Sequence, residues 1–599
     1  MKKIGLGIFI LAFGFFVVLL SLGEYKITNK ILKDSVGDKS SAITSLNEYQ
    51  QVKAQTFTNQ FKFVADVKSL FKEANKQIIE KEGINDEDIS NLMYHSTQNN
   101  TLKFTKESVQ LAFTEGDATG KSKAKLIKEN LSWLFKRDDI ESKEKLSDIL
   151  NNKKADINAS LIRSKGFDES KYTEYLLPIT KKSTTGFVVN NKWLLFFLTL
   201  IMACVGVLMY VLPGLKKYSG IKNDGIYHNP ATNKGWIGII VGGFLIGFYI
   251  LLYWFPYYLT TWIVMVEPIK KALSGGEASQ WFLYGLMYTL AILVMGVRML
   301  IKYRHNKYQI FRTISVMFFQ LGFAFLIPEI LVKLNQPEFN FVNMWPLDYD
   351  FFFEWNLEKL QNNGGLGIFM LVWGIALFAI GVPIFVYFFG KRWYCSWVCG
   401  CGGLAETLGD PYRQLSDKSL KAWKIERWLI HGVLVFAVVM TGLVLYSYFS
   451  GNSTILGINS FQVRKTYGFM IGSVFSGVVG TGFYPLMGNR VWCRFGCPLA
   501  AYLGLVQRFK SRFRITTNGG QCISCGNCST YCEMGIDVRA YAQKGQNIVR
   551  SSCVGCGVCS AVCPRGVLKL ENGPTENRVS DLPIILGNDG IVKLNDNLK

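Results

Sequence analysis

Cysteine is the residue type in this chain whose number and spacing point to chemistry. Of the fourteen cysteines, only Cys204 precedes residue 395, and eight fall within 522–563. These eight form two runs of one pattern, Cys522-x2-Cys525-x2-Cys528-x3-Cys532 and Cys553-x2-Cys556-x2-Cys559-x3-Cys563. Three thiolates spaced two residues apart can bind three corners of one iron–sulfur cubane, and the fourth cysteine of the run binds the other cluster.

The two runs therefore predict the ligands of two [4Fe–4S] clusters, which we call cluster one and cluster two. We expect cluster one to be bound by Cys522, Cys525, Cys528 and Cys563. We expect cluster two to be bound by Cys553, Cys556, Cys559 and Cys532. Paired Cys-x2-Cys motifs also bind zinc. A zinc site does not need a doubled run of four cysteines with an x3 step, so the pattern favours iron–sulfur clusters.

A second pattern is a pair of Cys-x3-Cys motifs, each directly after an apolar run. The motifs are Cys395 to Cys399, followed by Gly400 and Cys401, and Cys493 to Cys497, followed by Pro498. Cysteines at i and i+4 share one helix face, so two such pairs at neighbouring helix ends could offer four thiolates to a metal ion or a third cluster. Two other interpretations stay open for these four cysteines, namely a redox dithiol relay and thiols packed at the membrane interface.

The elements that must position these cysteines are membrane helices. Of the 599 residues, 49% are hydrophobic and only 18% are charged, whereas soluble proteins have about 25% charged residues. The apolar residues form runs of about twenty, which is the length that crosses a bilayer. These runs predict eight spans, at 4–22, 193–213, 235–258, 281–301, 313–333, 366–390, 428–449 and 468–487. A purely soluble enzyme and a disordered scaffold are thereby excluded.

The short loops between the spans predict the orientation. The loops after the second, fourth and sixth spans are basic, the first of them through Lys216, Lys217, Lys222 and Lys234, whereas the loop at 334–365 is acidic. Basic loops stay on the cytoplasmic side. We therefore expect a multi-pass protein of the bacterial cytoplasmic membrane, with both termini cytoplasmic and residues 24–190 extracytoplasmic. The same loops explain the net charge of +22, so we expect no nucleic-acid partner.

The predicted fold is a polytopic α-helical membrane protein with a mostly helical extracytoplasmic domain and a C-terminal two-cluster, ferredoxin-like α+β domain. Its segments are a membrane anchor at 1–23, the extracytoplasmic domain at 24–190, a membrane core at 191–490 with a Cys-x3-Cys loop at 395–401, a Cys-x3-Cys-Pro and basic connector at 491–515, the ferredoxin-like domain at 516–571 and a tail at 572–599.

The order of these parts resembles the membrane polyferredoxins of the NosR/NirI, NapH and CcoG type. The resemblance covers roughly 366–571, and within it the segment from about 521 to 571 is similar to the bacterial two-cluster ferredoxins. Two residues depart from the pattern, because Glu533 rather than proline follows Cys532 and Gly400 rather than proline follows Cys399.

Other cofactors are not expected. NosR-type proteins carry a Ser/Thr-Gly-Ala-Thr-like motif for covalent FMN, and segment 24–190 lacks it. Haem b would need paired histidines inside the spans, and of the four histidines only His431 touches a span. No Cys-x2-Cys-His motif for c-type haem is present in the sequence.

The resemblance implies an electron carrier in the membrane lipid rather than a substrate-converting enzyme, so we assign no catalytic residue. We expect electrons from a cytoplasmic ferredoxin or flavodoxin, or from quinol, to pass toward an extracytoplasmic respiratory reductase. The basic residues Arg508, Lys510, Arg512 and Arg514 could attract an acidic donor, although a positive-inside collar explains them equally well. The alternative is an accessory or redox-sensing factor for the assembly or maturation of a respiratory metalloenzyme.

Overall fold

The computed structural model describes residues 1–98, 101–102, 104–113, 118–136, 142–216, 235–455, 457–574, 584–586 and 590–592. The loop residues Lys217, Lys222 and Lys234, and most of the predicted tail, lie outside these ranges. The chain divides into two compact units. One comprises Phe15–Phe196 and Trp254–Met265, and the other comprises Met1–Gly14, Phe197–Tyr253 and Val266–Lys599.

The unit that contains Phe15–Phe196 is mostly helical, as the sequence predicts for 24–190. Its helices are α2 (Asn29–Val36), α3 (Ser40–Thr44), α4 (Asn47–Ala54), α5 (Gln60–Glu82), α6 (Asp86–Ser96), α7 (Lys106–Phe113), α8 (Ala118–Asn130), α9 (Lys143–Lys165), α10 (Tyr172–Ser183) and α11 (Phe187–Asn190). Two short strand pairs accompany them, β1 (Glu24–Tyr25) with β4 (Thr184–Thr185) and β2 (Thr97–Gln98) with β3 (Thr101–Leu102). The rings of Phe71 and Phe167 stack in its core, with centroids 4.4 Å apart.

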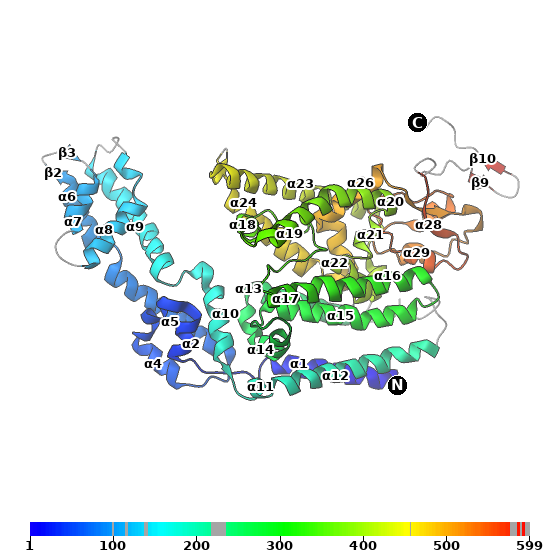
Figure 1. The fold of residues 1–599 in the computed structure, drawn as a ribbon, viewed down its shortest axis with the longest axis horizontal. Coiled ribbons are helices and arrows are strands. Elements are labelled where there is room, and N and C mark those ends of the chain that lie inside the picture. The colour runs from blue at the N-terminus through cyan, green and yellow to red at the C-terminus, as the bar shows by residue number, and fades with distance from the viewer. Residues whose placement is uncertain are drawn as a thin grey trace. The chain divides into compact units, whose positions relative to one another are not determined.

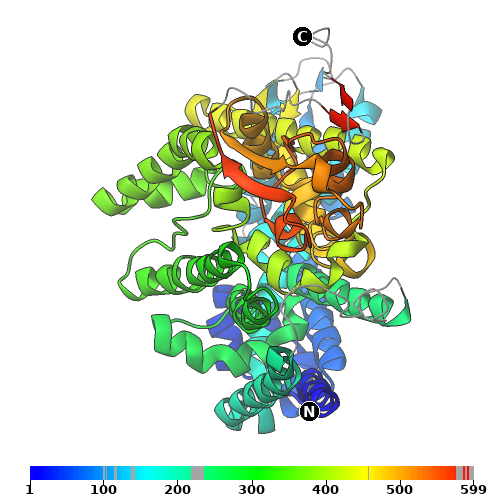
Figure 2. The same cartoon turned by 90° about the vertical axis from the view of Figure 1, so that its right-hand side faces the viewer.

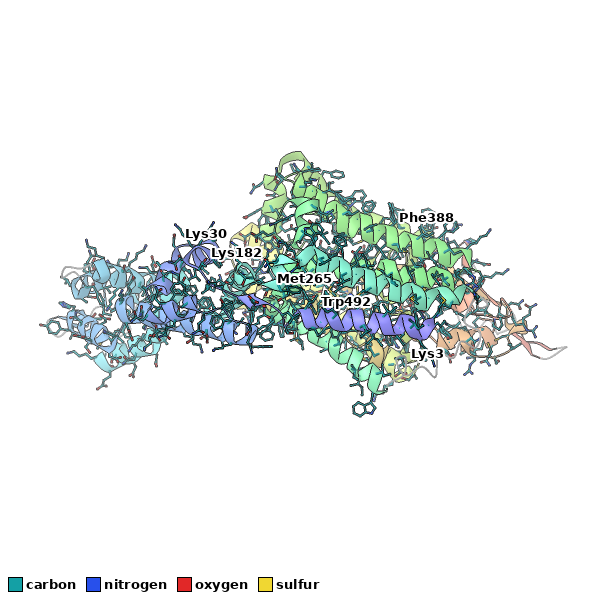
Figure 3. The ribbon with its side chains drawn as sticks, turned by 90° about the horizontal axis from the view of Figure 1, so that it is seen from below. Lys3, Lys30, Lys182, Met265, Phe388 and Trp492 are labelled. Atoms are coloured by element: carbon teal, nitrogen blue, oxygen red, sulfur yellow. The ribbon has the colours of Figure 1, made fainter. Side chains whose placement is uncertain are left out.

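Seven helices of the described chain are long and apolar enough to cross a membrane. They are α1 (Lys2–Leu19), Lys192–Lys216 with α12 (Lys192–Val211), α13 (Trp236–Trp254), α15 (Gln280–Lys302), Lys307–Lys333 with α16 (Lys307–Phe318) and α17 (Ile327–Lys333), Gly364–Phe389 with α19 (Gly364–Ala376) and α20 (Val382–Phe389), and α23 (Leu420–Ser450). Several of these run side by side in Figure 1. Apolar side chains such as Phe388, which is 44% exposed, cover their outer faces (Figure 3).

Glycines set the closest of these helix contacts. A Cβ at Gly5 of α1 would lie 2.7 Å from the carbonyl oxygen of Gly206 in α12. Small residues at such a crossing let two membrane helices approach closely, and van der Waals packing then holds them together.

The segment predicted as an eighth span, 468–487, is not one continuous helix. A π-helical stretch, Gly468–Val479, is followed by a turn and by the short helix α25 (Tyr484–Met487). The Tyr253 ring occupies the space beside Gly477, where a Cβ would lie only 2.6 Å from it. At Gly477, α13 therefore leaves no room for a side chain. The number of crossings therefore stays a prediction.

The C-terminal part is the α+β domain that the sequence predicts. Strand β7 (Phe513–Thr517) pairs in antiparallel fashion with β8 (Leu568–Asn572), with Ile515 opposite Leu570. These two strands are the long orange and orange-red arrows of Figure 2. The helices α27 (Asn527–Thr530), α28 (Val538–Gln543) and α29 (Val558–Ala561) lie between them in the chain.

Further helices and strand pairs complete the described chain. They are α14 (Thr260–Ser274), α18 (Glu354–Asn362), α21 (Arg392–Cys395), α22 (Gly400–Thr407), α24 (Ser460–Tyr467) and α26 (Pro498–Phe509), with the strand pairs β5 (Thr454–Ile455) and β6 (Ile458–Asn459), and β9 (Ile584–Leu586) and β10 (Gly590–Val592).

Candidate metal centres

The first Cys-x3-Cys motif bridges two short helices. Cys395 is the last residue of α21, and Cys399 is the N-cap residue of α22. A Cβ at Gly402 would lie 2.0 Å from the carbonyl oxygen of Cys395. Only glycine therefore lets the first turn of α22 fold back against the end of α21.

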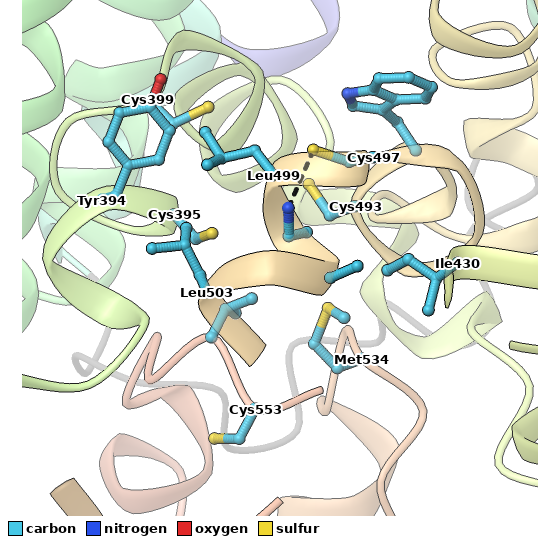
Figure 4. Packing of buried hydrophobic residues seen from close by; sticks show 14 of the residues in the cluster. Tyr394, Cys395, Cys399, Ile430, Cys493, Cys497, Leu499, Leu503, Met534 and Cys553 are labelled. Carbon is cyan, nitrogen blue, oxygen red and sulfur yellow. Dashed lines mark hydrogen bonds between the residues drawn. The ribbon is translucent and has the colours of Figure 1, made fainter. Parts of the chain in front are cut away.

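The second motif has a closely related local structure. Cys493 lies in the π-helical turn Trp492–Gly496, and Cys497 is the N-cap residue of α26. The Ala500 amide donates to the Cys497 sulfur at 3.4 Å (Figure 4). Pro498 occupies the first helical position, where its missing N–H costs nothing.

The structure brings the two motifs together. We call their four cysteines, Cys395, Cys399, Cys493 and Cys497, the membrane quartet. All four side chains are buried in one apolar core, which also includes Ile430 of α23. In Figure 4 the thiols of the two motifs point toward one another. Burial and mutual proximity are what a shared metal centre requires.

Two helix N-termini point at the membrane quartet, because Cys399 and Cys497 cap α22 and α26. A helix N-terminus carries partial positive charge and favours a thiolate. Both capping residues have extended backbones, with ψ of 125° at Cys399 and 111° at Cys497. Gly400 therefore produces the same local geometry that Pro498 produces in the second motif.

The thiols of this site differ in acidity. Burial raises the pKa of Cys395 to about 12. The pKa of Cys399 is lowered to about 7, chiefly because the Cys401 thiol donates a hydrogen bond to it, and Arg490 adds to the effect. Arg490 Nη1 also lies 3.6 Å from the Cys493 sulfur. The protein thus directs positive charge and hydrogen-bond donors at these sulfurs.

The structure also brings together the eight tail cysteines in the two crossed sets that the sequence predicts. One cavity is lined by Cys522, Cys525, Cys528 and Cys563. A second cavity is lined by Cys532, Cys553, Cys556 and Cys559. Gly526, Gly555 and Gly557, which stand between the ligands, all have positive φ angles of 78°, 61° and 74°. They allow the sharp turns that wrap the backbone around each cavity.

The spacing of the thiols favours clusters over a single small ion. A tetrahedral zinc with Zn–S bonds of about 2.3 Å places its sulfurs about 3.8 Å apart. Among the described residues, only Glu406, Glu533 and Cys556 bring three candidate ligand atoms within 4.8 Å of one another. No three cysteines of any set do so, which suits a wider cubane. The two carboxylates of that trio are ion-paired with arginines, which makes them poor ligands for a cation.

The ligand loop of cluster two, residues 553–559, is hydrogen-bonded to the part of the chain that carries the apolar helices and the two Cys-x3-Cys motifs. We call this part, residues 192–515, the membrane-facing part. Four consecutive carbonyl oxygens, from Cys553 to Cys556, each accept a hydrogen bond from a side chain of that part. The donors are Gln507 to Cys553 at 2.9 Å, Ser396 to Val554 at 2.8 Å, Tyr308 to Gly555 at 2.7 Å, and Gln309 and Arg312 to Cys556 at 2.8 and 3.0 Å. Ser396 lies inside the first Cys-x3-Cys motif. The ligand loops of cluster two and the membrane quartet are thus in direct contact.

Sequence reasoning missed the buried carboxylates beside these loops. Burial alone would raise the pKa of Glu406, but the guanidinium groups of Arg312, Arg413 and Arg490 lower it to about 2. Asp410 is fully buried and pairs with Arg413 at 2.8 Å. The acidic residues Glu406 and Asp410 in the largely basic segment after Cys401 were the available signal. Charge bias between spans explains the basic residues of this segment as a cytoplasmic loop and gives no sign that they pair with buried carboxylates.

Two of the four basic residues that could attract an acidic donor, Arg512 and Arg514, donate hydrogen bonds within the chain. Arg512 donates to the Gly573 carbonyl at 3.1 Å and Arg514 to the Pro574 carbonyl at 2.9 Å, so both bind the end of β8. Arg508 lines a cavity described below.

Three segments of the chain match models of iron–sulfur families. Residues 514–564 match a 4Fe-4S dicluster domain, and residues 370–420 and 468–516 match a 4Fe-4S binding domain. The first segment contains all eight cysteines of the two predicted cluster sets, and the other two contain one Cys-x3-Cys motif each. Together with the apolar helices, these matches define an iron–sulfur protein with membrane helices, and they confirm the resemblance to the membrane polyferredoxins.

Relatives with electron-transfer names support this class. The chain is 28% identical over 160 residues to the electron transport protein YccM of Escherichia coli (strain K12), which is 25% of this chain and 43% of the relative. It is 29% identical over 185 residues to the methylamine utilization ferredoxin-type protein MauN of Paracoccus denitrificans, which is 29% of this chain and 59% of the relative. The chain spans about half the length of the curated relatives it matches. No solved structure matches it.

Proposed function

We propose that the protein transfers electrons between a cytoplasmic donor or quinol and an extracytoplasmic respiratory reductase. Three cysteine sets are proposed as its metal sites, namely those of cluster one, cluster two and a third [4Fe–4S] cluster at the membrane quartet. Bound clusters supply one-electron chemistry, and the protein supplies ligation, burial and hydrogen bonds. The observation that carries the proposal is the direct contact between the cluster-two loop and the first Cys-x3-Cys motif, through Ser396 and Val554.

The order of the sites suits a path from solvent to membrane. Cys525 of cluster one is exposed, whereas Cys553 and Cys559 of cluster two are buried. Cluster one is therefore the entry point for a soluble donor. Arg539 and Arg565 line its cavity, and their positive charges would attract an acidic ferredoxin or flavodoxin.

A cavity beside the membrane quartet suits the alternative donor, quinol. It has a volume of about 490 Å³ and is lined by Cys493, by His431 and Arg427 of α23, and by Met534 of the ferredoxin-like domain. Trp423 and Trp428 also line it, and such aromatic side chains are typical of the membrane interface. His431 Nδ1 lies 2.6 Å from the Arg427 carbonyl oxygen. When Nδ1 is the protonated nitrogen, Nε2 is an acceptor for a hydroxyl proton.

The test uses the full-length protein in sealed vesicles that contain a membrane-impermeant, electron-accepting haem protein. Dithionite outside the vesicles reduces only tails that face outward. We expect the wild type to reduce the trapped acceptor. The Cys493→Ser/Cys497→Ser variant should lose this reaction while its tail clusters are still reduced, and Cys204→Ser serves as the control. A wild type that reduces its clusters but never the acceptor contradicts the proposal.

That negative outcome would favour the accessory or redox-sensing alternative. The two functions differ further when the protein is depleted after a reductase has been assembled. An electron carrier leaves the assembled reductase without its donor, whereas an assembly factor leaves it fully active.

A further inference from the structure

A buried ionic network lies between the Cys-x3-Cys loops and the cluster-two loop. Its members are Arg298, Lys302, Arg312, Glu406, Asp410, Arg413, Arg490 and Glu533. The side chains of Arg413, Arg490, Asp410 and Glu533 are fully buried. Charges are costly to bury and persist only where each is paired. The network therefore fixes the relative positions of the loops that contribute to it.

Glu533 is the member of the network that the ferredoxin-like domain contributes. It directly follows Cys532, the ligand that crosses over to cluster two. Its carboxylate accepts from Arg413 Nη1 at 2.6 Å and from Asn489 Nδ2 at 3.2 Å, and it pairs with Arg490 Nε at 3.0 Å. Arg413 follows the first Cys-x3-Cys motif in the chain, and Asn489 and Arg490 precede the second. The Glu533 carboxylate thus connects both segments that carry the Cys-x3-Cys motifs to the ligand loop of cluster two.

Arg490 extends this link to the membrane quartet. Its Nη2 lies 2.6 Å from Glu406, and its Nη1 donates to the Cys395 carbonyl at 3.1 Å and contacts the Cys493 sulfur at 3.6 Å. A single guanidinium group therefore touches two ligands of the quartet on one side and Glu533 on the other.

The charges of the network do not balance. Within this network, as the described residues form it, five cations face three carboxylates. A surplus of buried positive charge needs nearby anions, and metal-bound thiolates beside Arg490 and Arg312 would provide them. Such positive charge stabilises the reduced, more negative form of a cluster, and each carboxylate in the network opposes that effect.

The two cysteine runs differ at the residue that follows their fourth cysteine. Pro564 follows Cys563 and is exposed, whereas Glu533 follows Cys532 and is buried. A proline at 533 could neither pair with Arg413 nor bind Asn489. The departure from the ferredoxin pattern is thus located where the tail contacts the membrane-facing loops.

We propose that Glu533 is a positioning residue that locks cluster two onto the two Cys-x3-Cys segments and lowers the reduction potential of cluster two. This inference rests on the proposed clusters. The Glu533→Gln variant keeps the shape of the side chain and removes its charge. Glu533→Asp keeps the charge and shortens the reach, and Glu571→Gln, at an exposed position of β8, is the matched control.

The experiment is an EPR-monitored redox titration of the full-length protein in detergent, with iron content and amide hydrogen exchange measured on the same samples. In Glu533→Gln we expect unchanged iron content and a cluster-two potential shifted upward by at least 59 mV, which is a tenfold change in the ratio of reduced to oxidised cluster. The cluster-one potential should stay at the wild-type value. Amides at 553–556 should exchange faster in both Glu533→Gln and Glu533→Asp, and Glu533→Asp should keep the wild-type potential.

The electrostatic role and the positioning role of Glu533 are tested separately. Equal shifts in both clusters, or no shift in either, would overturn the electrostatic role of Glu533. Unchanged amide exchange at 553–556 in both variants would overturn the positioning role. A wild type without iron would instead refute the proposed function, and that result is distinct from both. If Glu533→Gln fails to fold, the exchange rates of Glu533→Asp still decide the positioning role.

Discussion

The two cluster sites of the tail have the same cysteine spacing and opposite surroundings. At cluster one, Cys525 and Ile523 face solvent, and the Ile523 side chain is 53% exposed. At cluster two, four consecutive loop carbonyls accept hydrogen bonds from side chains of the membrane-facing part, among them Ser396 and Tyr308. The cysteine spacing is shared, so the two sites differ in what surrounds them: solvent at cluster one, and side chains of the preceding part of the chain at cluster two.

The largest expected effect comes from breaking the crossed ligation. Cys563→Ser should remove the solvent-facing cluster, and Cys532→Ser should remove the buried one, each with a loss of about four irons per chain. Iron analysis with EPR of the remaining cluster measures this, and Cys204→Ser is the control. Loss of the buried cluster in Cys563→Ser would show that the ligands do not cross.

The next effect should appear in the accessibility of the two clusters. We expect a hydrophilic ferrous chelator to remove iron from cluster one at least tenfold faster than from cluster two, because Cys525 is exposed while Cys553 is buried. The measurement follows the chelate absorbance over time in the dithionite-reduced protein. A single phase that accounts for all tail iron would contradict the difference in surroundings.

Removal of a buried cation should destabilise the contact at cluster two. Arg312→Leu leaves Glu406 with one partner fewer and removes a donor to the Cys556 carbonyl. Breaking a buried ion pair costs about 3–5 kcal/mol, so the midpoint of thermal unfolding should fall clearly. Lys569→Leu on exposed β8 should stay within about 0.5 kcal/mol of the wild type. An Arg312→Leu midpoint equal to that of the control would disprove the role of this ion pair.

A smaller effect is expected from one hydrogen bond of the cluster-two loop. Tyr308→Phe removes the donor to the Gly555 carbonyl and the acceptor for Trp397 Nε1. The cost should be about 1–3 kcal/mol, since two buried polar groups lose a partner. Hydrogen exchange of the 553–556 amides measures it locally, with the 522–525 amides as the internal reference. Faster exchange in both loops would indicate general destabilisation instead.

The sequence predicted how the eight cysteines at 522–563 are grouped better than it predicted their surroundings. Cysteine spacing alone gave the two quartets that line the tail cavities, because ligation depends on local turns at residues such as Gly526 and Gly557. Membrane helices followed from hydropathy, but within 468–487 the π-helical stretch Gly468–Val479 ends at a turn that precedes the short helix α25. The ionic network could not be predicted, because Glu533 and Arg413 are 120 residues apart in sequence and meet only in the fold.

The most direct test of the central claim is the content of iron and acid-labile sulfide per chain in anaerobically purified full-length protein. Three [4Fe–4S] sites predict about twelve irons for the wild type and about eight for the Cys493→Ser/Cys497→Ser variant, by the count of four irons per four-cysteine set. A wild type with about eight irons, unchanged in that variant, would contradict a cluster at the membrane quartet.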